Sequence, residues 1–281
     1  MVLRVAWVRA QVGALHHCDK SMLIAQRAGA RPRDRASASA TIRTMTSAQG
    51  GGLHHTVLTR IGSDLMSGRL SAGDVFSMEQ FEARYGVSRT VVREVIKVLE
   101  SIGVASSRRR VGVTIQPEER WEALSPVIIH WRLEGPQRLD QLREVSELRR
   151  GVEPEAARLA ASRATPAQVS RLRAAAAGMA ATGPTGDLGT YLAHDITFHR
   201  TLLTASGNAL LAGFAPFVAE ALTGRTEHDL MPDVPEHAAI VWHIEVAEAI
   251  AAGDADRAEV TMRHIVTEAQ EAMDEVGRPG G

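Results

Sequence analysis

The stretch GVSRTVVREVIKVLE, residues 86–100, decides the fold of the first part of this chain, because it predicts a tight turn followed by a two-sided helix. Basic residues recur at every fourth position, Arg89, Arg93 and Lys97, so they share one helix face. The other face carries the apolar residues Val92, Val95, Ile96 and Leu99. One face can therefore pack against protein while the other enters a DNA major groove. A solvated surface helix would show the same spacing.

The neighbouring residues decide between these two interpretations. Residues 76–85 have the length of a short helix that ends at Gly86, a residue suited to the left-handed conformation that closes a helix. A short helix, a glycine turn and a second helix form the helix-turn-helix pattern. Residues 103–115 then predict two β-prone runs around an arginine-rich turn, as expected of a hairpin wing beside DNA phosphates.

Residues 68–115 resemble the winged helix-turn-helix of GntR-type bacterial transcription regulators, through the string Gly-Val-Ser-Arg-Thr followed by Val-Arg-Glu. The resemblance implies that Arg89 and Arg93 touch bases and phosphates. It also implies that Gly112 is the wing glycine that lets the backbone enter the minor groove. The full predicted DNA-contacting set is Ser88, Arg89, Thr90, Arg93, Lys97, Arg110 and Gly112.

One departure from the family pattern affects DNA specificity. The family commonly has Pro-Ser-Glu, followed by Arg or another residue, before the second helix, whereas this chain has Phe-Ser-Met-Glu at 76–79. A DNA-contacting arginine of some relatives is therefore absent at Glu79. The operator preference of those relatives cannot be copied to this chain.

Length and charge divide the chain into parts with different partners. Its 281 residues are too many for one winged helix and suit about two domains. Residues 1–53 carry eight basic and two acidic side chains, residues 54–117 nine and six, and the remainder fifteen and twenty-five. The net charges are thus +6, +3 and −10, for a total of −1. This segregation favours a DNA-facing head and a body that DNA repels.

The sequence predicts five segments along the chain. Residues 1–52 form a mostly disordered basic tail, 53–117 the DNA-binding domain, 118–136 a linker with a short helix, 137–276 an all-α domain, and 277–281 a flexible C-terminus. Either the tail adds non-specific DNA affinity, or translation starts later, near Met45.

Cysteine usage and hydropathy predict where the protein works. Cys18 is the single cysteine, which excludes an internal disulfide and a thiol-rich metal site and suits a reducing cytosol. No run of about 18 apolar residues and no signal-peptide apolar region is found. We therefore expect a cytoplasmic protein that is nucleoid-associated when bound to DNA and has no membrane partner.

The C-terminal half is predicted to be helical to its end. Thr165-Pro166, Asp187 and Gly207-Asn208 are helix-start signals, and Gly253-Asp254 separates the last two helices. Pro154 is expected to kink the first long helix rather than end it. Alanine-rich stretches with Leu and Val at helical spacing favour an all-α bundle of about six or seven helices. The whole chain is thus predicted to be mainly α.

Residues 137–276 resemble the ligand-binding bundle, or FCD domain, of the FadR subgroup of GntR-type regulators. The motifs are Glu147-Leu148-Arg149 with Glu153, Asp195-Ile196-Thr197-Phe198-His199, Ala205-Ser206-Gly207-Asn208, His243, Ala249-Ile250 and Gly253-Asp254. Their order behind the winged helix carries the resemblance.

Asp195 and His199 predict a metal site, because residues four apart on a helix point the same way and offer one oxygen and one nitrogen. Such ligands suit zinc, nickel or manganese, and zinc is the first expectation. The resemblance adds His243 from another helix. Relatives with a third histidine place it at the position of Ile265, so His264 would be rotated away by about 100° and is the less favourable fourth candidate. The alternative is an exposed Asp–His pair worth about 0.3 to 0.5 kcal/mol, with His243 an ordinary core histidine.

An open metal beside Arg149 suits a small carboxylate effector, since a guanidinium can pair with an acid through two hydrogen bonds. The alternative is a salt bridge from Arg149 to Glu153, four residues on. Trp121, and Trp131 in the string Trp-Arg-Leu, resemble members that respond to sugar acids such as gluconate or galactonate.

Together these features predict a homodimeric repressor, joined through its α-bundle, that places two recognition helices in successive major grooves of a near-palindromic operator. An effector bound in the bundle would then control operator binding. One competing class is a metal-dependent helical enzyme using Asp195, His199 and His243, which lacks a nominated general base and leaves the winged helix unexplained. The other is an architectural protein that coats DNA without sequence preference.

Overall fold

The computed structural model describes residues 38–228 and 230–276, with side chains from residue 52 to 272 apart from 229. The tail before Ala38, with Cys18, and the C-terminal residues 277–281 lie outside the described residues. The first described helix, α2 (Ala38–Met66), begins well before the expected start at Leu53. Nothing in the sequence pattern explains this extension through the glycines at 50–52, which are unfavourable in helices.

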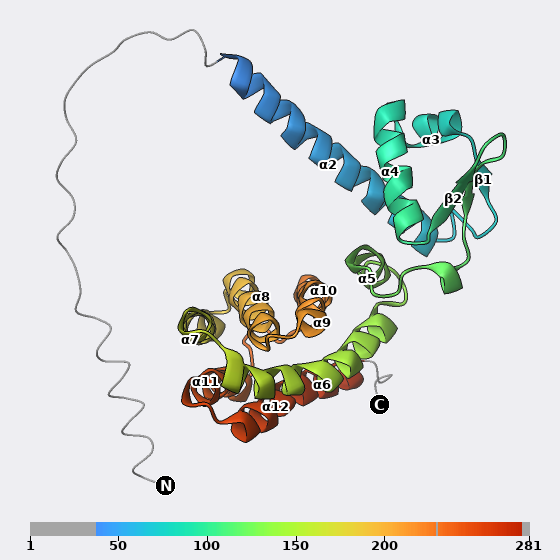
Figure 1. Ribbon diagram of the computed structural model, residues 1–281. Coiled ribbons are helices and arrows are strands. Elements are labelled where there is room, and N and C mark those ends of the chain that lie inside the picture. Colours follow the sequence, from blue (N-terminus) through green and yellow to red (C-terminus); the bar gives the residue numbers. More distant parts are fainter. Residues whose placement is uncertain (1–37, 229, 277–281) are drawn as a thin grey trace, which may run out of the picture. The chain divides into compact units, whose positions relative to one another are not determined.

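The head is a winged helix-turn-helix, as predicted (Figure 1). After α2 come β1 (Val75–Phe76), α3 (Met78–Tyr85), α4 (Arg89–Ser101), β2 (Ala105–Arg108) and β3 (Gly112–Ile115). β2 and β3 form the expected antiparallel hairpin, with Arg108 opposite Gly112. The sequence did not predict β1, which pairs antiparallel with β3 and makes the strand order β1-β3-β2. Two residues are too short to show a strand period.

Local sequence signals fix the two helices of the head. The Ser77 side chain accepts from the Gln80 backbone N–H, and the Gln80 side chain accepts from the Ser77 backbone N–H, which is a capping box at the start of α3. Gly86 ends α3 in the left-handed conformation with φ of 68°. α4 then buries its apolar face. The shared core of the head includes Ile61, Phe81, Leu99 and Ile115.

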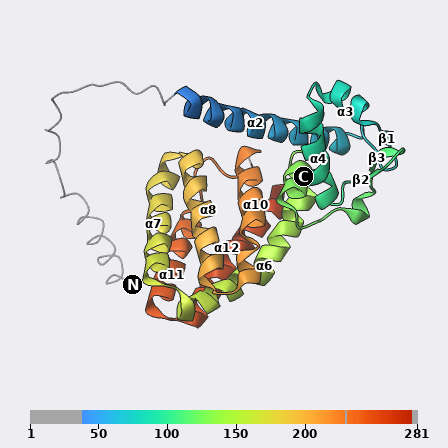
Figure 2. The same ribbon diagram turned by 45° about the horizontal axis from the view of Figure 1, so that its top comes forward.

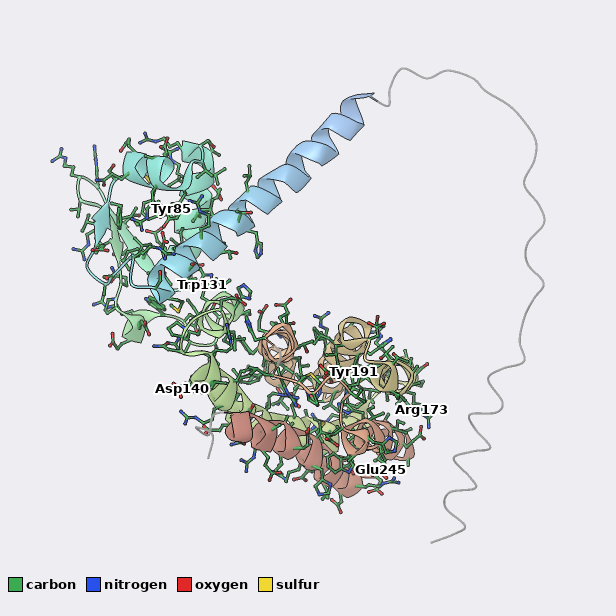
Figure 3. The ribbon with its side chains drawn as sticks, turned by 180° about the vertical axis from the view of Figure 1, so that it is seen from behind. Tyr85, Trp131, Asp140, Arg173, Tyr191 and Glu245 are labelled. Carbon is green, nitrogen blue, oxygen red and sulfur yellow. The ribbon has the colours of Figure 1, made fainter. Side chains whose placement is uncertain are left out.

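Asp64 ties the first helix of the head to the helix-turn-helix. Its carboxylate accepts from Arg69 Nε at 2.7 Å, from Arg84 Nη2 at 3.1 Å and from the Tyr85 hydroxyl at 3.0 Å. These hydrogen bonds lower the pKa of Asp64 against the opposing effect of burial. Tyr85 lies inside the head (Figure 3). The position of α3 on α2 therefore depends on a charged hydrogen-bond network as well as on apolar packing.

The predicted linker contains η2 (Glu118–Arg120) and α5 (Pro126–Leu133). α5 is apolar on two sides. Ile128 and Trp131 belong to the same buried cluster as the core of the head. Ile129 and Leu133 belong to a cluster with Leu142, Val145 and Ala221.

The C-terminal domain contains seven α-helices in its described part, in agreement with the prediction. They are α6 (Arg138–Arg163), α7 (Pro166–Thr182), α8 (Leu188–Ala205), α9 (Ala209–Ala212), α10 (Ala215–Glu227), α11 (His237–Ala252) and α12 (Ala255–Val276), with a short η3 (Gly183–Thr185) after α7. α7, α8 and α10 lie alongside one another in one layer (Figure 2). α11, α12 and α6 pack together as the second layer.

The predicted helix boundaries in this domain are confirmed. Thr165 forms a capping box ahead of Pro166, and the Asp187 and Asn208 side chains cap α8 and α9. Gly253 ends α11 with φ of 74°. α6 continues through Pro154. The core between the layers contains the fully buried residues Leu172, Met179, Phe198, Leu202 and Met262. Among the described helices, none has the length and apolar character needed to cross a bilayer.

Candidate DNA-binding face and candidate metal centre

The exposed face of α4 carries the side chains that the sequence nominated for DNA. Arg89, Thr90, Arg93 and Lys97 are exposed, as is Ser88 at the N-cap, while the apolar face of the helix is buried. The structure thus presents the basic residues along one face of the second helix of a helix-turn-helix. This is the placement that a recognition helix needs.

Two of these cations are paired in the structure. Arg89 Nη1 lies 2.9 Å from Glu79 Oε1 of α3, and Lys97 Nζ lies 2.8 Å from Glu94 Oε1 on its own helix. The first pair links the two helices of the motif through the position where some relatives carry arginine. Sequence reasoning noted the changed residue at Glu79 but not its partner.

The wing tip is basic and conformationally unusual. Arg108, Arg109 and Arg110 are all exposed. Arg110 has φ of 67°, and it is the one non-glycine residue with positive φ in the described part of the chain. An L-residue in this region costs roughly 1–2 kcal/mol.

The structure gives a reason for glycine at position 112 that differs from the role implied by the resemblance. Its φ is 116°, and an added Cβ would lie 2.6 Å from the Phe76 carbonyl oxygen in β1. The close approach of β1 to β3 therefore requires glycine here. Gly112 belongs to the packing of the three-stranded sheet, and substituting it would disturb the wing itself.

The bundle brings Asp195 and His199 of α8 together with His243 of α11. Each residue offers one ligand atom, and these atoms lie within 4.8 Å of one another. All three residues are buried, at 7%, 1% and 3% exposure. Asp195 and His199 are therefore not an exposed helix pair, which was the alternative interpretation of their spacing.

The hydrogen bonds around these residues leave ligand atoms unused. His243 Nδ1 lies 2.7 Å from the Ala239 carbonyl oxygen, which can only accept, so Nδ1 carries a proton, and in the neutral ring Nε2 keeps a lone pair for a metal. Nε2 faces Asp195 Oδ1 at 3.4 Å, and both atoms are buried without a hydrogen-bond partner. Two buried acceptors facing each other are unfavourable unless a cation lies between them. The donor set of one oxygen and two nitrogens therefore fits a divalent transition metal.

Glu153 and Arg149 of α6 support the third ligand. His199 Nδ1 lies 3.0 Å from Glu153 Oε2, a close contact without hydrogen-bond geometry, and His199 Nε2 lies 3.2 Å from Asp195 Oδ1. Arg149 Nε pairs with Glu153 Oε1 at 3.0 Å, with exposures of 5% and 0% for the two side chains. The salt-bridge alternative for Arg149 is thus present. A carboxylate on the far nitrogen of a histidine orients its ring as metal sites require.

These buried ionisable groups shift one another's pKa values. Burial would raise the pKa of Glu153, but the charges of Arg149 and His199 outweigh burial and lower it to about 2. Burial would lower the pKa of His199, but the Glu153 charge and hydrogen bonds to both carboxylates raise it to about 9. The two histidines likewise hold the pKa of Asp195 below its usual range against the effect of burial. The cluster is therefore built around anionic carboxylates.

The structure does not bring His264 to this cluster. It is exposed on α12, and its ring centroid lies 5.5 Å from that of Trp242. Ile265 lines the cavity beside the three candidate ligands instead. The one-residue offset along the helix turns His264 away, as its rotation of about 100° requires.

The candidate ligands line a small cavity with a volume of about 30 Å³. Arg149, Arg225 and Glu268 add charged groups to its wall. Tyr191, buried at 3% exposure, also lines it and lies inside the bundle (Figure 3). A volume of about 10–15 Å³ holds one water, so the cavity admits about two waters or a very small ligand as it stands. Sequence reasoning missed Arg225 and Glu268, since neither lies in a motif.

Trp121 and Trp131 do not line this cavity. Trp121 is 8% exposed, and its Nε1 donates to the Gln116 carbonyl oxygen at 2.9 Å. Trp131 is 2% exposed and packs so closely on Gly62 that a side chain there would overlap its ring. Both tryptophans are core residues, and they give no support to a sugar-acid effector.

Comparison with known proteins agrees with both halves of the structure. The family model for bacterial regulatory proteins of the gntR family matches residues 53–115, and the FCD domain model matches residues 144–268. The chain is a GntR-family transcriptional regulator with an FCD domain. Its two domains are those of regulators, and its FCD domain is consistent with the FadR-like subgroup.

The chain is similar to several proteins that are themselves named as transcriptional regulators. It is 24% identical to the galactonate operon transcriptional repressor of Escherichia coli, over 78% of this chain and 96% of that protein. It is 26% identical to the uncharacterized HTH-type transcriptional regulator YieP of Escherichia coli, over 58% and 71% of the two chains. Among solved structures, Lar of Listeria monocytogenes has a TM-score of 0.50 at 16% identity, over 79% of this chain and 97% of that chain, which supports the fold alone.

Proposed function

We propose that this regulator is a repressor whose operator binding is controlled by a small carboxylate bound at a divalent metal in the FCD domain. The observation that carries the proposal is the buried pair of unpartnered atoms, Asp195 Oδ1 and His243 Nε2, in a cavity of a DNA-binding protein. A metal ion between these two atoms would give both of them a partner.

Asp195, His199 and His243 would hold the metal, with zinc preferred and nickel or manganese compatible with the same ligands. When bound, the metal supplies positive charge to which a carboxylate or hydroxyl oxygen of the effector can attach. Other residues of the protein position the ligands and set their charges. Glu153 holds the His199 ring, Ala239 fixes the protonated nitrogen of His243, and Arg149 keeps Glu153 anionic.

The head would read a near-palindromic operator as part of a homodimer joined through the bundle. Two α4 helices would enter major grooves about one helical turn, roughly 34 Å, apart. An effector that binds the DNA-free conformation more tightly by a few kcal/mol would release the operator. The likeness to the galactonate operon repressor supports repression as the direction of control. Such a protein would work in the cytoplasm, on the chromosome.

Footprinting on the DNA upstream of the protein's own gene tests this function. We expect one protected palindrome, whose protection is relieved by a carboxylate only when the protein carries metal. Uniform protection along the fragment would instead identify an architectural DNA-coating protein. If removing the metal and adding each acid both leave the protected palindrome unchanged, effector control would be contradicted.

A further inference from the structure

A second arginine in the cavity is better placed than Arg149 to receive an effector. Arg225 of α10 lines the same cavity as the three candidate ligands. Its Nε is buried and has no hydrogen-bond partner. Burial lowers the pKa of this guanidinium, and the charge of Glu268 is the largest effect that opposes it. Arg225 is half-buried, and a buried donor such as its Nε is unfavourable until an acceptor binds it.

Arg149, by contrast, is already committed to the protein. Its Nε and Nη2 lie 3.0 and 3.5 Å from the two oxygens of Glu153, which is 0% exposed. Its Nη2 also lies 3.3 Å from His199 Nε2. Removing Arg149 from these contacts to bind an effector would leave the buried carboxylate of Glu153 without its arginine partner. Among the two arginines of the cavity, Arg225 is therefore the one with a donor that is open to a ligand.

The charge balance of the cavity distinguishes classes of acid. Arg149 and Arg225 contribute two positive charges, and Glu153, Asp195 and Glu268 contribute three negative ones. A divalent metal with neutral histidines brings the net charge to +1. One monoanion neutralises this site, whereas a dianion would leave a buried negative charge. Glu236 also lines the cavity, but it is exposed, so water screens its charge, and its effect within the cavity is to help burial raise the pKa of Glu268.

Glu268 adds a second restriction, because it is a hydrogen-bond acceptor facing the ligand space. It lies three residues after Ile265 on α12, so the two side chains share one helix face. An acceptor in a small cavity is satisfied by a ligand hydroxyl, and it repels a second carboxylate. The connection between α10 and α11 contributes Met231, Pro232 and Pro235 to the wall.

We propose that Arg225 binds the carboxylate of the effector and that Glu268 restricts the effector to hydroxylated monocarboxylates. This inference rests on the proposed function, because it places the ligand in the same cavity. It assigns the carboxylate to Arg225 rather than to Arg149. It also excludes dicarboxylates as effectors of the unmodified protein.

The test uses the metal-loaded full chain and measures affinity from the rise in melting temperature with added acid. The probes are lactate, glycerate and galactonate as hydroxylated monocarboxylates, propionate as an acid without a hydroxyl, and malate and tartrate as dicarboxylates. The variants are Arg225→Met, Arg225→Gln and Glu268→Gln, with Glu236→Gln as the exposed control on the same cavity. Metal content and operator binding are measured for each variant.

We expect at least one hydroxylated monocarboxylate to bind and stabilise the unmodified protein. Propionate, malate and tartrate should bind with at least tenfold lower affinity. Arg225→Met and Arg225→Gln should lower the affinity for that acid at least tenfold, while metal content and operator binding stay unchanged. Arg225→Met replaces the buried charge by an apolar chain, so it should fold. Glu268→Gln should bind malate or tartrate at least tenfold more tightly than the unmodified protein does. Glu236→Gln should bind every acid with the affinity of the unmodified protein.

Different failures have different meanings. Unchanged affinity in both Arg225 variants would overturn the assignment of the carboxylate, while leaving the proposed function standing. Preference of the unmodified protein for a dicarboxylate, or equal binding of propionate, would overturn the role of Glu268. A metal-loaded, operator-binding protein that responds to none of the six acids would overturn both this inference and the proposed effector class.

Discussion

Arg89 Nη1 of the recognition helix lies 2.9 Å from Glu79 Oε1 of the preceding helix. Both side chains are exposed, at 53% and 65%, so the pair contributes little to folding. The pair instead affects orientation, because the carboxylate of Glu79 restricts where the Arg89 guanidinium, which we propose to contact DNA, can point. A chain with arginine at position 79 would instead push Arg89 away and add its own contact.

The ion pair between Glu79 and Arg89 should influence which base the protein prefers. Glu79→Gln should change the preferred base at one position of each half-site, because Arg89 is then free to choose another geometry. The change in folding free energy should stay within about 0.5 kcal/mol. Selection of binding sites from a random DNA pool measures the preference. Glu94→Gln, which removes the carboxylate paired with Lys97, is the matched control. An unaltered base preference in Glu79→Gln would show that Glu79 does not position Arg89.

Arg93 should be the strongest single contributor on the helix. It is exposed on the basic face of α4, between Arg89 and Lys97. Arg93→Ala should weaken specific operator binding by roughly 1–3 kcal/mol, about 10- to 100-fold, while the melting temperature stays unchanged. A gel-shift titration together with thermal unfolding tests both parts. Wild-type affinity in this variant would contradict the docking of α4 in the groove.

The wing tip should show a conflict between stability and binding. Arg110 has φ of 67°, a conformation that asparagine tolerates better than arginine. Arg110→Asn should therefore stabilise the head by up to about 1 kcal/mol and remove one phosphate contact. Operator affinity should fall at low salt, with the slope against log salt concentration reduced by about one. A steeper or unchanged slope would place Arg110 away from the phosphates.

A histidine outside the metal site should make stability depend on pH. His130 Nδ1 lies 3.3 Å from Glu220 Oε2, and this hydrogen bond raises the pKa of His130 against the opposing effect of burial. A raised folded-state pKa stabilises the fold below the unfolded value of about 6.5, and the stabilisation is lost as pH rises through the folded value. The melting-temperature difference between wild type and His130→Gln should be largest below about pH 6.5 and decrease as the pH rises above that value. His264→Gln, on an exposed position, is the control. A difference that persists unchanged at high pH would refute this assignment.

The sequence predicted the parts of this protein that depend on local signals. The turn at Gly86, the cap at Thr165 and the stop at Gly253 each depend on one residue's own conformational preference, and all three lie where expected. The two-sided helix of residues 89–101 was visible for the same reason.

Features that depend on partners distant in sequence could not be predicted in this way. β1 exists because Val75 and Phe76 meet Thr114 and Val113, about forty residues later. Arg225 and Glu268 have no motif spacing, and only the packed bundle brings them to the cavity of Asp195. His264 was nominated by counting along the chain, and the rotation of α12 turns it outward.

The metal content of the purified protein tests the central claim most directly. Elemental analysis should find one divalent transition metal per chain in wild type after purification without chelator. Asp195→Ala and His243→Ala should lose it while retaining operator binding, because neither residue lies in the head. His264→Ala should keep the metal. Full metal occupancy in the Asp195 and His243 variants would contradict the account, since the unpartnered atoms of these two residues are what identify the site.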